Sequence, residues 1–234
     1  MDGVDRYFDT LVAAFVRGKL AADYQAGSAH DRLWRCLLED LSSDDVEQLV
    51  RLGKEAGLRL HKFKRTMELP RVKRVLGVLK GLGPADLLDV GSGRGTFLWP
   101  LLDSFPHLPI LAIDHDARRV TDIAAVRDGG IATLDALQMD ATALALDDGA
   151  FDVVTMLEVL EHIPAAQLAL AEAVRVARRF VVVSVPSTPD NNPEHIHLFT
   201  GQKLTAMFER AGAARVSVAY VLNHMIAVAK VTDG

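Results

Sequence analysis

The sequence predicts an α/β fold in which a helical region is followed by a largely parallel β-sheet. Up to about residue 80, apolar residues recur at helical spacing. From Ala85 onward, short apolar runs alternate with amphipathic segments, which is typical of βα units. A loop with glycines at alternate positions, 91–95, directly follows the first apolar run. We therefore expect an N-terminal helical cap or lid over residues 1–80 and a ligand-binding domain over 81–234.

Four helices are expected in the N-terminal part. Helical spacing of apolar residues places the first two at 7–16 and 33–41. The polar run 42–45 is a good N-cap region for a third helix, which a glycine ends. A fourth helix begins at Pro70, because proline is favoured in the first helical turn, and it ends before a Gly-Pro pair.

Seven strands are expected in the second part, and helices connect most of them. The first five apolar runs each suit a buried strand, and the last two suit a hairpin. The expected strands are 86–90, 109–113, part of 131–139, 151–156, 180–185, 214–220 and 224–231. The connecting helices begin near Gly95, Ala117 and Ala165, and a last helix covers about 200–211.

Length and composition suit one sizeable domain with a small appendage. The chain has 234 residues, of which half are hydrophobic, enough for a substantial core. No apolar run approaches the ~20 residues that cross a bilayer, and the acidic N-terminus lacks the order of a signal peptide. The single cysteine, Cys36, excludes an intramolecular disulfide framework and a cysteine zinc site. These features predict a cytoplasmic protein with no membrane partner.

The charge is distributed unevenly along the chain. The net charge is −5, but segment 59–80 holds eight basic residues against one acid, Glu68, and carries +7, so the remainder carries −12. Such a segment predicts a basic surface that meets a phosphate, a carboxylate or an acidic partner. The alternative is an ordinary solvated helix face. Within it, residues 61–66 are candidates to cover a carboxylate of a bound cofactor or to bind an anionic substrate.

The glycine loop predicts a ligand lying directly against the backbone. Glycine permits a sharp turn and a close approach, and the loop precedes a helix N-terminus. A dinucleotide-binding loop would need its third glycine where Thr96 stands, whereas this chain has Gly95. The pyrophosphate fingerprint is therefore not met. Because ligands of open parallel sheets bind beyond the carboxyl ends of the strands, polar residues there are candidate ligands.

The segment 87–96 resembles the first motif of class I S-adenosylmethionine (SAM)-dependent methyltransferases. Acids after the second and third strands, Asp114 and Asp140, and the segment 151–158 extend the resemblance in order. The resemblance covers about residues 85–231. It implies a three-layer, Rossmann-like methyltransferase sheet of seven strands whose last strand runs antiparallel, with the helical cap outside it, and SAM as the cofactor.

The candidate cofactor-binding residues follow from the strand ends and from this resemblance. A carboxylate at Asp114 can accept both ribose hydroxyl protons. Asp89 can orient the loop amides or reach the cofactor's amino group through water. In the resembled family, the residue after the ribose-binding acid borders the adenine, and the acid after the third strand binds its amine. The full set is Asp89, Gly91, Ser92, Gly93, Gly95, Asp114, His115, Asp140, Ala141 and Leu157.

A second group of polar residues predicts a metal site on the acceptor side. Glu158, Glu161 and His162 share one face if they form a helical turn, and the loop after the fifth strand brings His195 and His197 to the same cleft. Oxygen ligands with some imidazole suit Mg²⁺ or Mn²⁺ better than zinc.

This pattern resembles the metal sites of small-RNA 3′-terminal 2′-O-methyltransferases and of ubiquinone-pathway O-methyltransferases, where an ion positions the accepting hydroxyl. Counted back from Thr200, His195 fits the RNA enzymes better than His197 does, so the predicted ligands are Glu158, Glu161, His162 and His195. The same Glu-x-x-Glu-His pattern is also frequent in methyltransferases without a metal. There the first histidine caps a helix or packs under the cofactor, and loop histidines bind backbone.

Transfer to oxygen is the favoured chemistry. An oxygen acceptor loses its proton as the methyl arrives, and the candidate catalytic residues are His162, His195, His197 and Glu158. The Asn/Asp-Pro-Pro-Tyr/Phe motif of amide and adenine N-methyltransferases is absent after the fourth strand. The leading hypothesis is O-methylation of a small molecule. The alternatives are a metal-assisted RNA ribose 2′-O-methyltransferase that contacts RNA through 59–80, and a non-catalytic domain that binds SAM or a partner.

Overall fold

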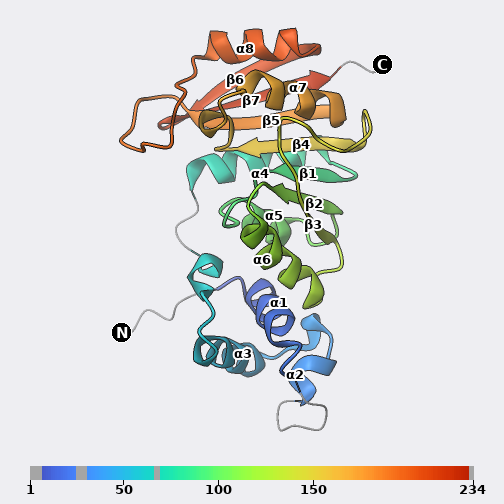
Figure 1. The fold of residues 1–234 in the computed structure, drawn as a ribbon. Coiled ribbons are helices and arrows are strands. Elements are labelled where there is room, and N and C mark those ends of the chain that lie inside the picture. The colour runs from blue at the N-terminus through green and yellow to red at the C-terminus, as the bar shows by residue number, and fades with distance from the viewer. Residues whose placement is uncertain (1–6, 25–30, 66–68, 232–234) are drawn as a thin grey trace.

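The fold is built on a seven-stranded sheet, and Figure 1 shows its strands one after another from β6 at one edge to β3 at the other. The computed structural model describes residues 7–24, 31–65 and 69–231. Thr66 and Glu68, which belong to the basic segment 59–80, lie outside the described residues. The strand order is β3-β2-β1-β4-β5-β7-β6, and β7 runs antiparallel to both of its neighbours. The strands are β1 (Leu87–Val90), β2 (Ile110–Asp114), β3 (Leu134–Gln138), β4 (Phe151–Leu157), β5 (Ala177–Pro186), β6 (Ala213–Val221) and β7 (His224–Val231).

Helices cover both faces of the sheet, which gives the predicted three layers. Side chains of β1 alternate between two cores: Leu87 packs with α4 (Pro70–Leu82), α5 (Leu98–Ser104) and α6 (Ala117–Asp128), whereas Leu88 packs with α7 (Ala166–Val176) and α8 (Gly201–Arg210). All four residues of β1 are buried, because a central parallel strand has a helix layer on each side. The expected strands and the antiparallel last strand are confirmed.

The N-terminal helices lie at one end of the molecule (Figure 1), where α1 packs against both α6 and α3. They are α1 (Asp9–Leu20), α2 (Asp31–Arg35) and α3 (Ser43–Glu55), with 3₁₀ turns η1 (Leu38–Asp40) and η2 (Leu60–Phe63). Two glycines permit the close approach of α1 to α6. A Cβ on Gly18 would lie 1.9 Å from the oxygen of Ala125, and one on Gly129 would lie 1.7 Å from that of Ala14.

The prediction of a helix over 33–41 is wrong. The described chain forms only the short helix α2 and the turn η1 there, and Leu37 between them is extended. The guanidinium of Arg17 donates to the backbone oxygen of Cys36 at 3.1 Å. That carbonyl is thereby engaged outside the helix, and the helix does not continue past this point. The N-cap prediction is confirmed, since Ser42 and Asp45 form a capping box.

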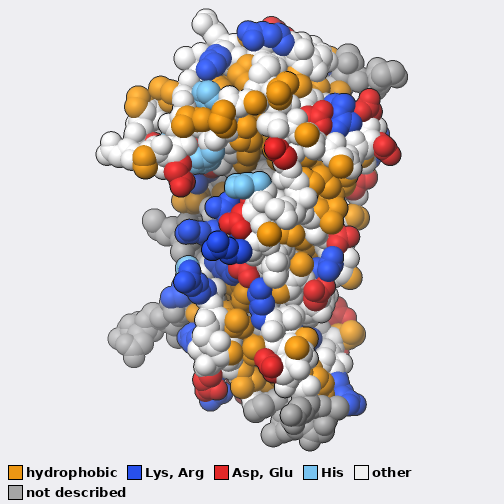
Figure 2. All heavy atoms as spheres, viewed as in Figure 1, with side chains coloured by type: hydrophobic (Ala, Val, Ile, Leu, Met, Phe, Trp, Pro, Cys, Tyr) orange, Lys and Arg blue, Asp and Glu red, His pale blue; other side chains and the backbone are white. Residues whose placement is uncertain are grey.

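The last helix of the first 80 residues, α4, packs on the sheet beside α5 and so lies in the layer of the second part. The basic segment 59–80 runs through η2 and α4, and Figure 2 shows Lys and Arg side chains gathered in the middle of this face. It is this segment of the cap that approaches the glycine loop. Among the described residues, no helix is long and apolar enough to span a membrane.

Candidate functional site

A cavity of about 490 Å³ opens at the carboxyl ends of β1, β2 and β4. This is where open parallel sheets bind ligands, and the volume is within the usual range for small-molecule sites. Eight predicted site residues line it: Asp89, Gly91, Ser92, Gly93, His115, Leu157, Glu158 and His162. The remaining lining residues are Arg71, Val72, Arg94, Thr96, Phe97, Arg119 and Glu194.

The three glycines of the loop have different surroundings. All have positive φ, at +72° for Gly91, +58° for Gly93 and +84° for Gly95. A Cβ on Gly91 would lie 2.6 Å from Val159, and one on Gly95 would lie 2.0 Å from Trp99. A Cβ on Gly93 would meet nothing closer than 3.7 Å. Gly93 therefore borders the open cavity, whereas its two neighbours are packed against the protein.

Asp89 is a buried carboxylate beneath this loop. Ser92 Oγ donates to one of its oxygens at 2.7 Å, and Thr155 Oγ1 donates to the other at 2.8 Å. Burial raises the pKa of Asp89 to about 6, and these two hydrogen bonds oppose the rise. Asp89 thus joins the loop to β4 and fixes the base of the cavity.

Asp114 supports the loop from β2. Its side chain is 1% exposed and accepts from the backbone N–H of Gly93 at 2.8 Å and from that of Asp116 at 2.9 Å. Arg119 Nη1 lies 3.4 Å from the same carboxylate. Asp114 does not itself line the cavity; the exposed His115 and the half-buried Arg119 beside it do. Its predicted contact with a ribose stays a prediction.

Besides Asp114, three predicted cofactor residues lie outside the cavity lining. Gly95 is buried against Trp99. Asp140 is exposed and accepts from the backbone N–H and the hydroxyl of Thr142, both at 2.8 Å, and the pKa of Asp140 is lowered by these bonds. Ala141 packs at the margin of the core. The adenine-binding roles of Asp140 and Ala141 remain predictions.

Glu158 is held from two sides at the end of β4. Ser184 Oγ donates to its Oε1 at 2.7 Å, and His224 Nε2 lies 3.0 Å from its Oε2. Arg71 Nε is 3.7 Å from the same Oε2. The backbone of Glu158 has a φ of +57°, which L residues rarely adopt and which often marks functional positions.

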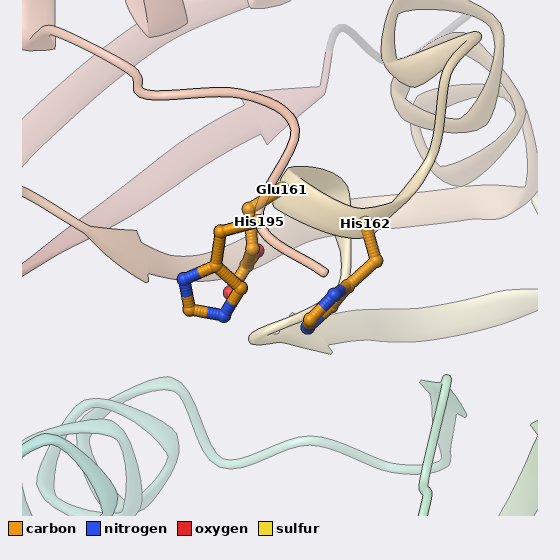
Figure 3. Close-up of side chains that lie close together, drawn as sticks. All are labelled: Glu161, His162 and His195. Atoms are coloured by element: carbon orange, nitrogen blue, oxygen red, sulfur yellow. The ribbon is translucent and has the colours of Figure 1, made fainter. Parts of the chain in front are cut away.

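Glu161, His162 and His195 form a cluster beside the cavity (Figure 3). One ligand atom from each lies within 4.8 Å of the others. Glu161 and His162 come from the turn η3 (Leu160–His162), and His195 comes from the loop after β5. Figure 3 shows the three side chains projecting to the same side. Glu158, the fourth predicted ligand, is not part of the cluster, and neither is His197, which was predicted to reach the same cleft as a catalytic candidate.

The Glu161 carboxylate is buried without a hydrogen bond. The residue is 0% exposed, and neither side-chain oxygen has a hydrogen-bond partner among the described residues. Burial raises the pKa of Glu161 to about 8, and the nearby charge of Glu158 adds to the rise. An unpaired buried carboxylate is costly, so this residue calls for a compensating group.

The two histidines of the cluster are oriented by partners outside it. His162 Nδ1 donates to the backbone oxygen of Glu194 at 3.0 Å, and His195 Nδ1 lies 2.8 Å from Oδ2 of Asp190. Both rings therefore keep Nε2 as the atom available to a ligand. His197 instead donates from Nε2 to the backbone oxygen of Ile163 at 3.1 Å, which matches the backbone-binding alternative for a loop histidine.

Several site residues were not anticipated from the sequence. Arg71, Arg94 and Arg119 line the cavity, and Ser184 and His224 hold Glu158. The last two become neighbours only through strand order: Ser184 is paired with Leu157 across β4 and β5, and His224 is paired with Pro186 across β5 and β7. A polar residue at the end of each strand is the signal that could have indicated them.

Comparison with known proteins agrees with this geometry. Residues 88–182 match a family described as "Methyltransferase domain". The chain is 35% identical over 119 residues to a malonyl-[acyl-carrier protein] O-methyltransferase of Geobacter sulfurreducens, covering 48% of this chain and 41% of that protein. The chain thus spans about two fifths of the length of that curated relative.

Solved structures share the fold at lower identity. A SAM-dependent methyltransferase from Aquifex aeolicus matches with a TM-score of 0.59 and 22% identity, over 71% of this chain and 92% of the other. The N-terminal domain of EvdMO1 with SAH bound matches with a TM-score of 0.58 and 16% identity, over 80% and 97%. The fold is that of a Rossmann-like methyltransferase. The matched methyltransferase domain and the shared fold agree with the resemblance to class I SAM-dependent methyltransferases that the sequence carries.

Proposed function

We propose that this chain transfers the methyl group of SAM to an oxygen atom of a small molecule. The observation that carries the proposal is that one cavity is bordered by the open face of Gly93 on one side and by Glu158 and His162 on the other. A donor and an acceptor held together there would react as if in a single molecule. The Geobacter relative is an O-methyltransferase, which supports oxygen as the acceptor atom.

The glycine-loop side of the cavity suits SAM. The missing side chain of Gly93 leaves room for a ligand against the backbone, and His115, Arg119 and Leu157 complete the wall. SAM supplies a methyl group already activated by its sulfonium. The protein therefore has to position the donor, exclude water and accept one proton.

His162 is the proposed proton acceptor. Its Nδ1–H is bound to the backbone oxygen of Glu194, so the neutral ring carries a lone pair on Nε2. The ring lines the cavity, where that lone pair can remove the proton of an acceptor hydroxyl. Glu158, fixed by Ser184 and His224, is proposed to orient the acceptor.

The cluster beside the cavity fits a divalent ion, Mg²⁺ or Mn²⁺. The unpaired carboxylate of Glu161 and the two oriented imidazoles, His162 and His195, supply the oxygen and nitrogen donors. When bound, such an ion lowers the pKa of a coordinated hydroxyl. We propose these three residues as the ligands. With the ion bound, Nε2 of His162 would be a ligand rather than the base, and the acidified hydroxyl would lose its proton to solvent; His162 acts as the base when no ion is bound. Glu158, the fourth ligand of the prediction, is engaged by Ser184 and His224 instead.

Binding of Mn²⁺, followed by calorimetry or electron paramagnetic resonance, tests the metal site. Glu161→Gln should weaken Mn²⁺ binding at least about tenfold, because it removes the charged ligand. Glu194→Gln is the matched control: it makes the same change in the neighbouring loop, where His162 binds the backbone oxygen of Glu194 and Glu194 is not among the clustered ligands. Equal Mn²⁺ binding by wild type and Glu161→Gln, or none by wild type, would remove the metal and leave His162 as the base.

The RNA alternative rests on the basic segment 59–80. Three of its cations already contact carboxylates of the chain: Lys62 pairs with Asp122, Arg65 with Asp103, and Arg71 lies near Glu158. This pairing favours a small acceptor over an extended phosphate backbone. RNA affinity that falls steeply between low and moderate salt would support the alternative, since neutralising phosphates releases counterions.

The proposal is tested first by titration with S-adenosylhomocysteine (SAH), the product left by methyl transfer. One-to-one binding is expected, and its absence would contradict the cofactor assignment. Binding without any transfer to broad pools of acceptors would favour the remaining alternative, a domain that binds SAM without catalysis.

A further inference from the structure

A second cavity, of about 270 Å³, lies beside the proposed reaction site. It is bounded by η2, the start of α4, the glycine loop and α5, and it shares Val72, Arg94 and Thr96 with the first cavity. It lies on the Gly95 side of the loop, where Trp99 is packed, rather than on the open side of Gly93. The second cavity is therefore on the other side of the loop from the surface proposed for the cofactor, and it adjoins the first cavity at the three shared residues.

The wall of the second cavity combines apolar and cationic side chains. The apolar part is Phe8, Leu69, Val72, Leu76, Trp99 and Pro100. The charged part is Lys62, Lys64, Arg65 and Arg94, against a single acid, Asp103, with His61 beside them. Figure 2 shows Lys and Arg side chains gathered over this part of the molecule. An apolar wall with an excess of cations suits a ligand with an apolar body and an anionic group.

The cations of this cavity are unequally neutralised. Arg65 and Asp103 form a two-pronged pair, with contacts of 2.7 and 3.1 Å, so this arginine is satisfied within the protein. Lys62 shares the carboxylate of Asp122 with Lys19, so two ammonium groups depend on one acid.

The shared ammonium is also removed from water. The Lys62 side chain is 11% exposed and lies over the rings of Phe15 and Phe63, at 4.2 and 5.4 Å from their centroids. Burial lowers its pKa, and the charge of Lys19 adds to the effect. A bound anion would relieve this surplus of positive charge.

Arg94 stands where the two cavities meet. It is exposed, and in the described part of the chain its guanidinium has no ion-pair partner. Its backbone is fixed, since Trp99 Nε1 donates to the Arg94 oxygen at 3.0 Å. A guanidinium presents parallel N–H groups that match a carboxylate or a phosphate. The position of Arg94 lets one ligand contact it while extending into the reaction cavity.

We propose that the second cavity binds the anionic group, a carboxylate or a phosphate, of the methyl acceptor, through Arg94 and Lys62. The apolar body of the acceptor lies against Trp99 and Leu76, and its hydroxyl reaches the cavity that holds His162. This inference rests on the proposed function and names its substrate class: small apolar molecules with one anionic end.

The test is calorimetric titration of the SAH-bound protein with phenyl phosphate, benzoate and benzyl alcohol. The two anions should bind more tightly than the alcohol, and the tighter of the two identifies the anionic group. Arg94→Gln should weaken anion binding about tenfold while SAH affinity changes less than about twofold. Because Arg94 is exposed, this variant is expected to fold; Lys62→Met is the second variant. Lys80→Gln is the matched control. Like Arg94→Gln, it removes one positive charge, but from an exposed position on α4 that lies outside both cavities.

Three results would overturn the proposal. Benzyl alcohol could bind as well as the anions, or Lys80→Gln could weaken anion binding as much as Arg94→Gln does. Arg94→Gln could also weaken SAH as strongly as the anions, in which case the cavity serves the cofactor's carboxylate. The anions are also titrated into the free protein. Failure to bind SAH would then contradict the proposed function, while the anion measurement still decides the proposal made here.

Discussion

The backbone N–H of Gly93 donates to the buried carboxylate of Asp114 across 2.8 Å. This bond joins the glycine loop after β1 to the end of β2, the two strands that bound the proposed cofactor surface. Asp114 also receives the N–H of Asp116 and faces Arg119, so its carboxylate organises three groups around one edge of the cavity. The loop geometry that leaves Gly93 open thus depends on a residue that does not itself line the cavity.

Asp114→Asn should weaken SAH binding at least about tenfold. An amide cannot accept from both N–H groups and also balance the charge of Arg119, so the loop loses its support. Calorimetry with SAH measures the effect. Asp116→Asn is the matched control, because the Asp116 side chain accepts from the N–H of Arg118 at 2.9 Å and lies 3.7 Å from Arg119 Nε, whereas it is Asp114 that holds the N–H of Gly93. SAH affinity of Asp114→Asn equal to that of the control would refute the role given to Asp114.

Alanine substitutions at two glycines of the loop should affect different properties. Gly93→Ala should mainly weaken SAH binding, and Gly91→Ala should mainly lower stability. Gly93→Ala meets open space and should cost only about 1 kcal/mol of stability through its positive φ, yet it should reduce SAH affinity by filling the cofactor surface. Gly91→Ala places a Cβ 2.6 Å from Val159 and should destabilise the fold by more than that. Urea unfolding and SAH titration separate the two. Unchanged SAH binding by Gly93→Ala would mean that the cofactor lies elsewhere.

Asp89 should make the free energy of unfolding decrease as the pH rises from about 4 to about 6. Its pKa is raised from 3.8 to about 6 by burial, so the folded state binds the proton more tightly than the unfolded state does. Stability then decreases as pH rises through this window, by up to about 3 kcal/mol, and is level above it.

Asp89→Asn should remove this contribution. The free energy of unfolding of the variant relative to wild type should therefore rise from pH 4 to pH 6, as urea unfolding at both pH values would show. A difference between the two proteins that is independent of pH would contradict the raised pKa.

Arg179→Ala should destabilise the fold by about 2 kcal/mol. The guanidinium pairs with Asp152, whose side chain is 5% exposed and which also accepts the backbone N–H of Ala85 at 2.9 Å. Removing the cation leaves a buried carboxylate short of a partner. Arg179 holds the pKa of Asp152 below its usual value, so the loss should shrink as pH falls towards and below the ordinary range of a carboxyl.

The neighbouring arginine is a matched control for this prediction. Arg178 lies 3.8 Å from Asp152 and is about half exposed, so Arg178→Ala should cost less than about 1 kcal/mol. Thermal or urea unfolding compares the two variants at neutral pH. Equal losses would show that the Asp152 carboxylate does not depend on the Arg179 contact.

The strands and the start of α3 could be predicted because residues close together in the sequence determine them. The run from His224 to Val231 gives β7 at the predicted bounds, and the polar run 42–45 gives the capping box that begins α3. The helix predicted at 33–41 failed because a distant side chain, Arg17, engages the backbone of Cys36. Local spacing does not contain that contact.

The candidate site also has a part that could be predicted from the sequence and a part that could not. The residues after each strand were found because parallel strands end at one edge. The holding of Glu158 by Ser184 and His224 was not found, because it needs the pairing of β4 with β5 and of β5 with β7. Arg71 and Arg94 reach the cavity only through the docking of α4 and the shape of the glycine loop. These depend on tertiary packing, which spacing alone does not give.

The most direct test of the account is transfer of a radiolabelled methyl group from SAM to a cell extract, separated into small-molecule and RNA fractions. Each reaction is run with and without EDTA, and with Asp114→Asn as a control whose affinity for the cofactor should be at least about tenfold lower. We predict label in the small-molecule fraction, reduced by EDTA and reduced in the variant at limiting SAM. Label confined to RNA, or no transfer by a protein that binds SAH, would contradict the central claim of small-molecule O-methylation.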